Sequence, residues 1–414
     1  MKILFKNIKG LLQTIGKEIS YLKGLEMKNL SQINNAYLII NDDSIIDFGE
    51  MHSCPKPHVD KIIDANGKYI LPAWCDSHTH LVYSGSRENE YVDRINGLSY
   101  EEISKNGGGI LNSAKELKNT SNKQLYDQSA KRLEEVISLG TGAVEIKSGY
   151  GLCLSEEIKM LEVINKLNEN YDISIQSTFL AAHAVPEKFK NNKKKYINQI
   201  VKKWIPFVAK KKLAKYIDVF CEKGYFSLSE TKQILEAGVE NGFIPKVHVN
   251  QFNSIGGVEL CREYNALTID HLEVLTKDDL NILKNSSIMP VGLPNCSFFL
   301  NIPYTPGRKI IDNNIPFTLA SDFNPGSSPS GNMNLVISLA CSKMGLSPEE
   351  AINAATINGA YAMGLSKELG SITIGKKANL ILTKSISSYS MIPYAFGSNL
   401  IEDVYINGKS INNL

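Results

Sequence analysis

The sequence predicts an α/β protein with a TIM-like (β/α)8 barrel and a small β-sandwich domain built from both ends of the chain. Two observations indicate this architecture. Eight apolar, strand-like runs alternate with stretches that fit amphipathic helices through the middle of the chain, as in a barrel of parallel strands. Both ends contain short strand patterns separated by turn residues. We therefore divide the chain into residues 1–70, a barrel at residues 71–369, and residues 370–414.

The two β-rich ends are expected to pair in one domain. Residues 36–40 and 44–49 consist mostly of strand-forming residues around a turn at 41–43, which predicts a hairpin. An Asn-Gly turn at 66–67 precedes an apolar run at 69–75 that we interpret as one buried strand. Further strands are expected near the C-terminus, at residues 370–375, 378–382 and 404–409.

The middle of the chain supplies the barrel. The eight strand-like runs lie at residues 71–76, 142–147, 173–181, 217–221, 244–249, 267–270, 287–293 and 316–321. Amphipathic stretches between them lie at residues 125–139, 155–168, 228–241 and 256–264. A lysine-rich segment at 188–215 interrupts the pattern. We interpret it as a solvated helical connection rather than a nucleic-acid surface, because no basic motif or aromatic array accompanies it.

Composition limits the function classes. The net charge of +2 over 414 residues gives no general attraction to nucleic acid or to a membrane. The seven cysteines form no C-x-x-C pair, so we expect free thiols in a reducing compartment. Lysine breaks the N-terminal apolar run too early for a signal peptide, and no run reaches the roughly 18 residues of a membrane span. We expect a cytoplasmic protein.

Five of the seven histidines follow predicted barrel strands, where such barrels carry their functional residues. His78 and His80 end the first strand, and side chains two residues apart on a strand point to the same face. The ends of the third, fifth, sixth and eighth strands carry His183, His248, His271 and Asp322. His52 and His58 lie in the first β-rich segment, and we assign them no functional role.

Imidazoles and a carboxylate that converge at one end of a barrel are typical ligands of zinc or iron. We favour His78, His80, His248 and Asp322 as the ligands of a single ion with room for one water. The ion would lower the pKa of that water and make hydroxide available as a nucleophile. Asp322 would also take the proton, and His271 would orient the water or polarise a carbonyl oxygen from outside the ligand set.

The spacing of these residues resembles the mononuclear branch of the amidohydrolase superfamily. After the fourth strand, residues 221–224 (CEKG) hold no lysine placed to become a carbamate between two metals, which favours one ion. Lys147 on the second strand leaves a two-metal site as the alternative. Longer motifs resemble the imidazolonepropionase family over nearly the whole chain, most weakly in residues 1–35 and the lysine-rich segment. These motifs are HTHLVYSGSRENE (78–90), GGGIL (107–111), EIKSGYGL (145–152), DVFCE (218–222) and SDFNPGSSP (321–329).

This resemblance implies a metal-dependent hydrolase barrel that opens the ring of 4-imidazolone-5-propanoate with water. The product would be N-formimidoyl-L-glutamate, in the third step of histidine degradation. The resemblance also implies one zinc or iron ion per chain and a homodimer. The residues implied to contact the imidazolone or the product are Arg87, Tyr150, His183, Gln251, Asn324, Gly326 and Ser327.

The residue types fit this substrate. Arg87 offers a planar guanidinium for a carboxylate or a carbonyl oxygen. Tyr150 and His183 follow the second and third strands and are placed to hydrogen-bond the ligand, and His183 is a further catalytic candidate. Gln251 stands where some family members carry glutamate, and an amide is no general base, so Gln251 would only position the substrate. Tyr100 is a further binding candidate, with core packing as the alternative.

Three other functions stay open from the sequence. Another mononuclear amidohydrolase, such as a cyclic-amide hydrolase or a nucleobase deaminase, shares the metal-ligand spacing. Arg87, Tyr150 and the 324–326 motif favour instead a substrate with a carboxylate tail. A non-catalytic barrel would be expected to lack a metal ligand, and the sequence retains all four. The lysine-rich segment leaves nucleic-acid binding as a remote alternative. We expect a small molecule as the partner, with neither nucleic acid nor a membrane.

Overall fold

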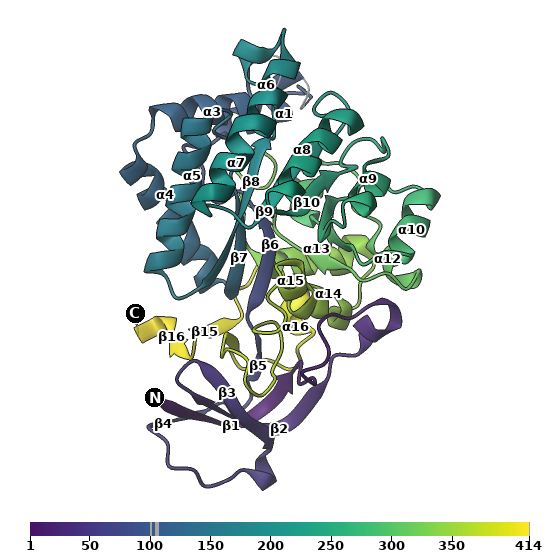
Figure 1. The fold of residues 1–414 in the computed structure, drawn as a ribbon. Helices are drawn as coiled ribbons and strands as arrows, with labels where there is room; N and C mark the ends of the chain where they lie inside the picture. Colours follow the sequence, from purple (N-terminus) through teal and green to yellow (C-terminus); the bar gives the residue numbers. More distant parts are fainter. Residues whose placement is uncertain (100–101, 104–106, 414) are drawn as a thin grey trace.

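The computed structural model describes residues 1–99, 102–103 and 107–413, so the candidate Tyr100 lies outside the described residues. Figure 1 shows a barrel of strands and helices beside a sheet that joins the two ends of the chain. The predicted fold class is confirmed. No helix in the described part of the chain is long and apolar enough to cross a membrane.

Eight parallel strands form the barrel in sequence order. They are β6 (Trp74–Thr79), β7 (Thr141–Lys147), β8 (Ser174–Ala182), β9 (Tyr216–Cys221), β10 (Ile244–Val249), β11 (Thr268–His271), β12 (Met289–Gly292) and β13 (Thr318–Leu319). Each overlaps one predicted run. Backbone hydrogen bonds between the end of β6 and the chain after β13 join the two edges. The His80 N–H donates to the Phe323 carbonyl at 2.9 Å, and the Asp322 N–H donates to the His78 carbonyl at 3.0 Å.

Helices cover the outside of the barrel, so strands such as β9 are buried along their whole length. The helices are α1 (Glu88–Ile95), α3 (Ile110–Asn119), α4 (Asn122–Ser138), α5 (Leu154–Asn170), α6 (Lys193–Gln199), α7 (Ile205–Lys211), α8 (Leu228–Glu240), α9 (Gly257–Glu263), α10 (Lys277–Lys284), α11 (Pro294–Leu300), α12 (Gly307–Asp312), α13 (Met333–Met344), α14 (Pro348–Ala355), α15 (Ile357–Ala362) and α16 (Met391–Tyr394). The four predicted amphipathic stretches are α4, α5, α8 and α9. Ser121 and Ser227 begin α4 and α8 with capping boxes, which fix where these helices start. In the lysine-rich segment, α6, a π-helical turn (Ile200–Trp204) and α7 form the predicted helical connection.

The two ends of the chain share a second, mixed sheet. Its strands are β1 (Lys2–Leu12), β2 (Gln32–Asn41), β3 (Ser44–Glu50), β4 (Lys61–Asp64), β5 (Tyr69–Pro72), β14 (Leu380–Thr383), β15 (Ile401–Ile406) and β16 (Lys409–Ser410). The predicted hairpin is the antiparallel pair β2 and β3. Antiparallel pairing of β5 with β14 connects the N-terminal strands to the C-terminal ones. The domain boundaries at residues 70 and 370 stay a prediction.

Two strand predictions need correction. Residues 69–75 form two strands rather than one, because β5 pairs in the terminal sheet whereas β6 enters the barrel after Ala73. Residues 370–375 form no regular strand. Ile372 makes one bridge to Thr14, and the backbone then turns, with the Lys376 N–H donating to the Thr373 carbonyl. The seven cysteines are free thiols, as predicted.

Lys376 provides a test of stability in the terminal domain. Its buried ammonium donates to the Leu369 carbonyl and the Ser371 hydroxyl, and burial lowers its pKa from 10.5 to about 8. The unfolded chain therefore holds this proton more tightly, so the free energy of unfolding falls as the pH drops from about 10.5 to about 8 and levels off below that. From pH 7 to pH 10, the stability of the wild type is expected to rise by up to about 3 kcal/mol relative to Lys376→Met. Urea unfolding at both pH values measures this difference, and a constant difference would contradict it.

Candidate active site

A small cavity of about 30 Å³ lies at the C-terminal ends of the barrel strands, where TIM barrels carry their active sites. Its lining residues are His80, Arg87, Ile110, Tyr150, His183, Phe220, His248, Gln251, His271, Asp322, Asn324 and Ser327. All of these except Ile110 and Phe220 are candidates from the sequence. His78 is fully buried beside the cavity. The structure therefore brings together residues that lie on different strands, as the barrel prediction requires.

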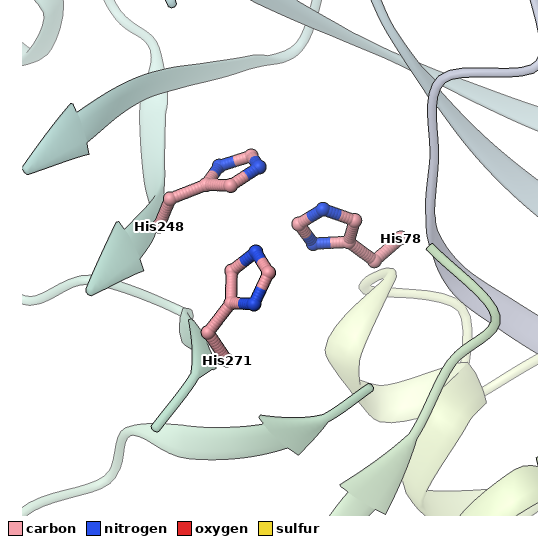
Figure 2. Close-up of side chains that lie close together, drawn as sticks. All are labelled: His78, His248 and His271. Carbon is pink, nitrogen blue, oxygen red and sulfur yellow. The ribbon is translucent and has the colours of Figure 1, made fainter. Parts of the chain in front are cut away.

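Three imidazoles from different strands face one another. Figure 2 shows the rings of His78, His248 and His271 converging from β6, β10 and the end of β11. The ring centres of His78 and His248 are 4.5 Å apart, and those of His248 and His271 are 5.2 Å apart. His80 stacks on His183 at 5.0 Å. Five histidines thus share one small buried region.

Asp322 lies between the two histidines of the H-x-H motif. Its Oδ1 is 3.6 Å from His78 Nε2 and 3.7 Å from His80 Nε2. These separations are too long for hydrogen bonds, but two ligands of one tetrahedral zinc ion lie about 3.4 Å apart. Among the described residues, the buried His78 Nε2 has no hydrogen-bond partner. Because buried polar atoms are normally partnered, this donor set fits a metal ion.

Carboxylates fix the orientation of two of these rings. Asp270 Oδ2 is 2.5 Å from His78 Nδ1, and Asp218 Oδ2 is 2.8 Å from His248 Nδ1. An imidazole that donates its Nδ1–H to a carboxylate keeps the Nε2 lone pair available for a metal. Burial also lowers the pKa of His78 well below its ordinary value, which keeps the ring neutral. Neutral imidazoles are what metal binding requires.

His271 and His183 have different partners. His271 Nδ1 is 3.1 Å from Glu273 Oε1, and His183 Nδ1 donates to the Gly149 carbonyl at 3.1 Å. Burial lowers the pKa of His183 to about 3. Burial opposes protonation of His271 too, but the charge and hydrogen bond of Glu273 raise its pKa above the ordinary value. His271 is therefore the better proton donor of the two.

The backbone at two site residues takes an unusual conformation. His271 has a φ of 90° and Asp322 a φ of 55°, in the left-handed region that residues other than glycine seldom adopt. Such conformations persist only where surrounding contacts hold them, and they concentrate at functional sites. The Thr305 hydroxyl donates to the His271 carbonyl at 2.6 Å, and the Asn324 amide donates to the Asp322 carbonyl at 2.6 Å.

Arg87 reaches the cavity from the start of α1. Its Nε and Nη2 lie 2.8 and 2.7 Å from Glu90 Oε2, and Glu90 also accepts from the Gly109 N–H and the Asn112 amide. A Cβ at position 326 would overlap the Arg87 guanidinium, so Arg87 would have to move if this glycine were replaced. Arg87 is 7% exposed, so its ion pair with Glu90 is largely buried rather than on the surface.

Sequence reasoning missed several residues of the site. Phe220 and Ile110 line the cavity, Glu90 orients Arg87, and Asp218 and Asp270 orient His248 and His78. The sequence of β9 contains a signal that could have identified two of them. Asp218 and Phe220 alternate with Val219 along the strand and so point into the barrel. An acidic residue at such an inward position needs a buried partner.

A family comparison decides the class of this barrel. The amidohydrolase family profile matches residues 69–411, which includes the barrel and the C-terminal strands β14, β15 and β16. The chain belongs to the amidohydrolase family. The fold alone is also shared with a triazine hydrolase variant (TM-score 0.75, 13% identity, 99% of this chain and 94% of that one covered). It is similar as well to a zinc-bound adenosine deaminase from Xanthomonas campestris (TM-score 0.70, 12% identity, 99% and 92% covered).

Sequence relatives place this amidohydrolase more narrowly. It is 61% identical to the imidazolonepropionase of Flavobacterium johnsoniae, over 99% of this chain and 100% of the relative. It is 38% identical to the imidazolonepropionase of Brevibacillus brevis, over 96% and 94% of the two chains. The resemblance to the imidazolonepropionase family is therefore confirmed. Among amidohydrolases, the chain belongs to this family.

Proposed function

We propose that the protein hydrolyses 4-imidazolone-5-propanoate to N-formimidoyl-L-glutamate, the third step of histidine degradation. The observation that carries this proposal is the 61% identity to an imidazolonepropionase over essentially the full length of both chains. In the reaction, water adds to the ring carbonyl carbon and the ring C–N bond breaks. The carbonyl becomes a carboxylate, and the ring nitrogen leaves with a proton as part of the formimidoyl group.

His78, His80, His248 and Asp322 would hold one zinc or iron ion. Three observations support this ligand set. One Asp322 oxygen lies near both His78 and His80, the buried His78 Nε2 has no hydrogen-bond partner among the described residues, and carboxylates contact the Nδ1 atoms of two of the rings. A bound ion would supply hydroxide near neutral pH. Lys147 on β7 contacts three carboxylates, and their charges raise its pKa although burial opposes this. It is thus no neutral amine for carbamate formation, which favours one ion.

The proton transfers fall to the residues around the reacting carbonyl. Asp322, whose pKa burial raises above the ordinary value, would accept the proton of the attacking water. His271 would donate a hydrogen bond to the carbonyl oxygen as charge develops there. Gln251 lines the cavity and would position the ring, since an amide takes no proton. His183, which also lines the cavity, would hydrogen-bond the ring.

The propionate tail is the feature that separates this substrate from a nucleobase. Arg87 would bind its carboxylate through the guanidinium fork, and Tyr150 and the turn at 324–327 would close the remaining side. Asn324 Oδ1 accepts the N–H groups of Gly326 and Ser327 at 2.8 Å, so this turn is held in place. The fixed turn supports the predicted ligand contacts of Gly326 and Ser327. The position of Tyr150 in the cavity lining supports its predicted contact.

Loss of imidazolone absorbance in the ultraviolet tests the proposed function. Zinc- or iron-loaded protein is expected to consume the substrate far faster than it decays unaided and to form N-formimidoyl-L-glutamate, identified by mass spectrometry. Guanine, cytosine and hydantoin, tested at the same concentrations, are expected to stay unchanged. Turnover of one of these in place of the imidazolone would reject the assignment.

Replacing Arg87 with alanine is expected to raise KM by roughly 10- to 100-fold and to change kcat little. The reason is that a charge-assisted hydrogen bond to the remote tail contributes equally before and during the reaction. Arg87→Lys keeps the charge but loses the planar fork, so an intermediate KM is expected. Steady-state kinetics of the three proteins measure both constants. A fall in kcat with an unchanged KM would instead place Arg87 at the reacting carbonyl.

A further inference from the structure

A cluster of buried charges lies behind the metal-site histidines. The Lys147 ammonium on β7 is 2.8 Å from Glu145 Oε1, 2.9 Å from Asp218 Oδ2 and 3.5 Å from Asp270 Oδ2. All four side chains are completely buried. A buried ammonium without close anions would be strongly unfavourable, so these contacts are required where Lys147 lies.

Two of these carboxylate oxygens are shared with imidazoles. Asp218 Oδ2, which contacts Lys147, is also 2.8 Å from His248 Nδ1. Asp270 Oδ2, which contacts Lys147 as well, is 2.5 Å from His78 Nδ1. One ammonium is therefore connected through single oxygen atoms to two imidazoles that come from β6 and β10.

Further contacts of Glu145 fix the position of Lys147. Its partner Glu145 also forms an ion pair with Lys246 of β10 at 2.5 Å and accepts from the Thr178 hydroxyl of β8. The Lys246 ammonium further donates to the Ala362 and Ser77 carbonyls at 2.7 and 3.2 Å. The ammonium of Lys147 thus has one location, between two carboxylates whose like charges would otherwise push them apart.

We propose that Lys147 is a positioning residue that sets the orientation of both His78 and His248 through Asp270 and Asp218, and thereby the metal affinity of the site. This inference rests on the proposed metal site but not on the identity of the substrate. Without the ammonium, the two carboxylates separate and both rings lose the fixed partner of Nδ1. Groups that hold metal-bound histidines typically change metal affinity by about 10- to 100-fold when removed.

The zinc affinity of Lys147→Met, measured by competition with a chromogenic chelator, tests the proposal. We expect at least a tenfold weaker affinity than in the wild type, and altered visible absorption bands in the cobalt-substituted protein. Lys376→Met is the matched control, because Lys376 is also a buried lysine but donates to the Leu369 carbonyl and the Ser371 hydroxyl rather than to a carboxylate. The zinc affinity of this control variant is expected to stay within a fewfold of the wild-type value. Its cobalt spectrum is expected to match that of the wild type.

The outcomes separate the two proposals. A wild type that retains no zinc would reject the proposed metal site, whereas equal zinc affinities for the wild type and Lys147→Met would reject the role of Lys147. If Lys147→Met does not fold, Glu145→Gln/Lys147→Met removes one charge of each sign and keeps the charge balance. Normal zinc affinity in that double variant would also overturn the proposal, and weak affinity in a folded double variant would support it.

Discussion

Replacing Asp322 with asparagine is expected to lower kcat by about 10²- to 10⁴-fold, the usual contribution of a positioned acid or base. Asparagine keeps the size of the side chain and one oxygen, but its amide accepts no proton. Asp322 is 3% exposed at the cavity and lies within 4 Å of both H-x-H imidazoles, so no other described carboxylate has its position. Steady-state hydrolysis of the imidazolone by fully metal-loaded protein gives the value.

Metal content must be measured in the same samples, because Asp322 is also a proposed ligand. Asp312→Asn is the control: Asp312 pairs with Arg308 on the surface at 2.7 Å, and its replacement is expected to leave kcat unchanged. A metal-loaded Asp322→Asn protein with more than a tenth of the normal kcat would contradict the role of Asp322. The proton acceptor would then have to be His271.

The sequence predicts the barrel well because its strands are buried on both faces and read as short apolar runs. The prediction fails where one apolar run contains two strands that belong to different sheets. Tyr69 to Thr79 looks like one strand, yet β5 pairs with β14 and β6 pairs with β7. Which sheet a residue joins depends on partners 59 or more positions away along the chain, and no local pattern records them.

In the candidate site, too, some residues can be predicted from the sequence and others cannot. Histidines at strand ends are predictable because the barrel brings all strand ends to one face. The sequence identifies Lys147 as a strand residue and as a carbamate candidate, but its three carboxylate partners become visible only with the structure. Asp218 and Asp270 lie 71 and 123 positions from it, as their numbers show. Pairing between inward-facing charges is a property of the closed barrel rather than of any one strand.

Glu157→Ala is expected to destabilise the protein by about 3 kcal/mol and to raise KM for the imidazolone roughly tenfold. The buried Glu157 carboxylate accepts three backbone N–H groups of the loop after β7, from Gly149 at 3.0 Å and from Gly151 and Leu152 at 2.8 Å. Alanine leaves these buried donors without a partner, and each costs about 1 kcal/mol or more. The loop carries Tyr150, which lines the cavity, so a more mobile loop is expected to weaken substrate binding.

Glu162→Ala is the matched control for this change. Glu162 lies on the same helix, α5, and is exposed, and substitutions at exposed positions usually change stability by less than about 0.5 kcal/mol. Urea unfolding and steady-state kinetics of both variants separate the two effects. If Glu157→Ala unfolds earlier but keeps its KM, the loop tolerates the loss and Tyr150 does not depend on it. If both variants behave alike, the three N–H contacts do not hold the loop, because only Glu157 makes them.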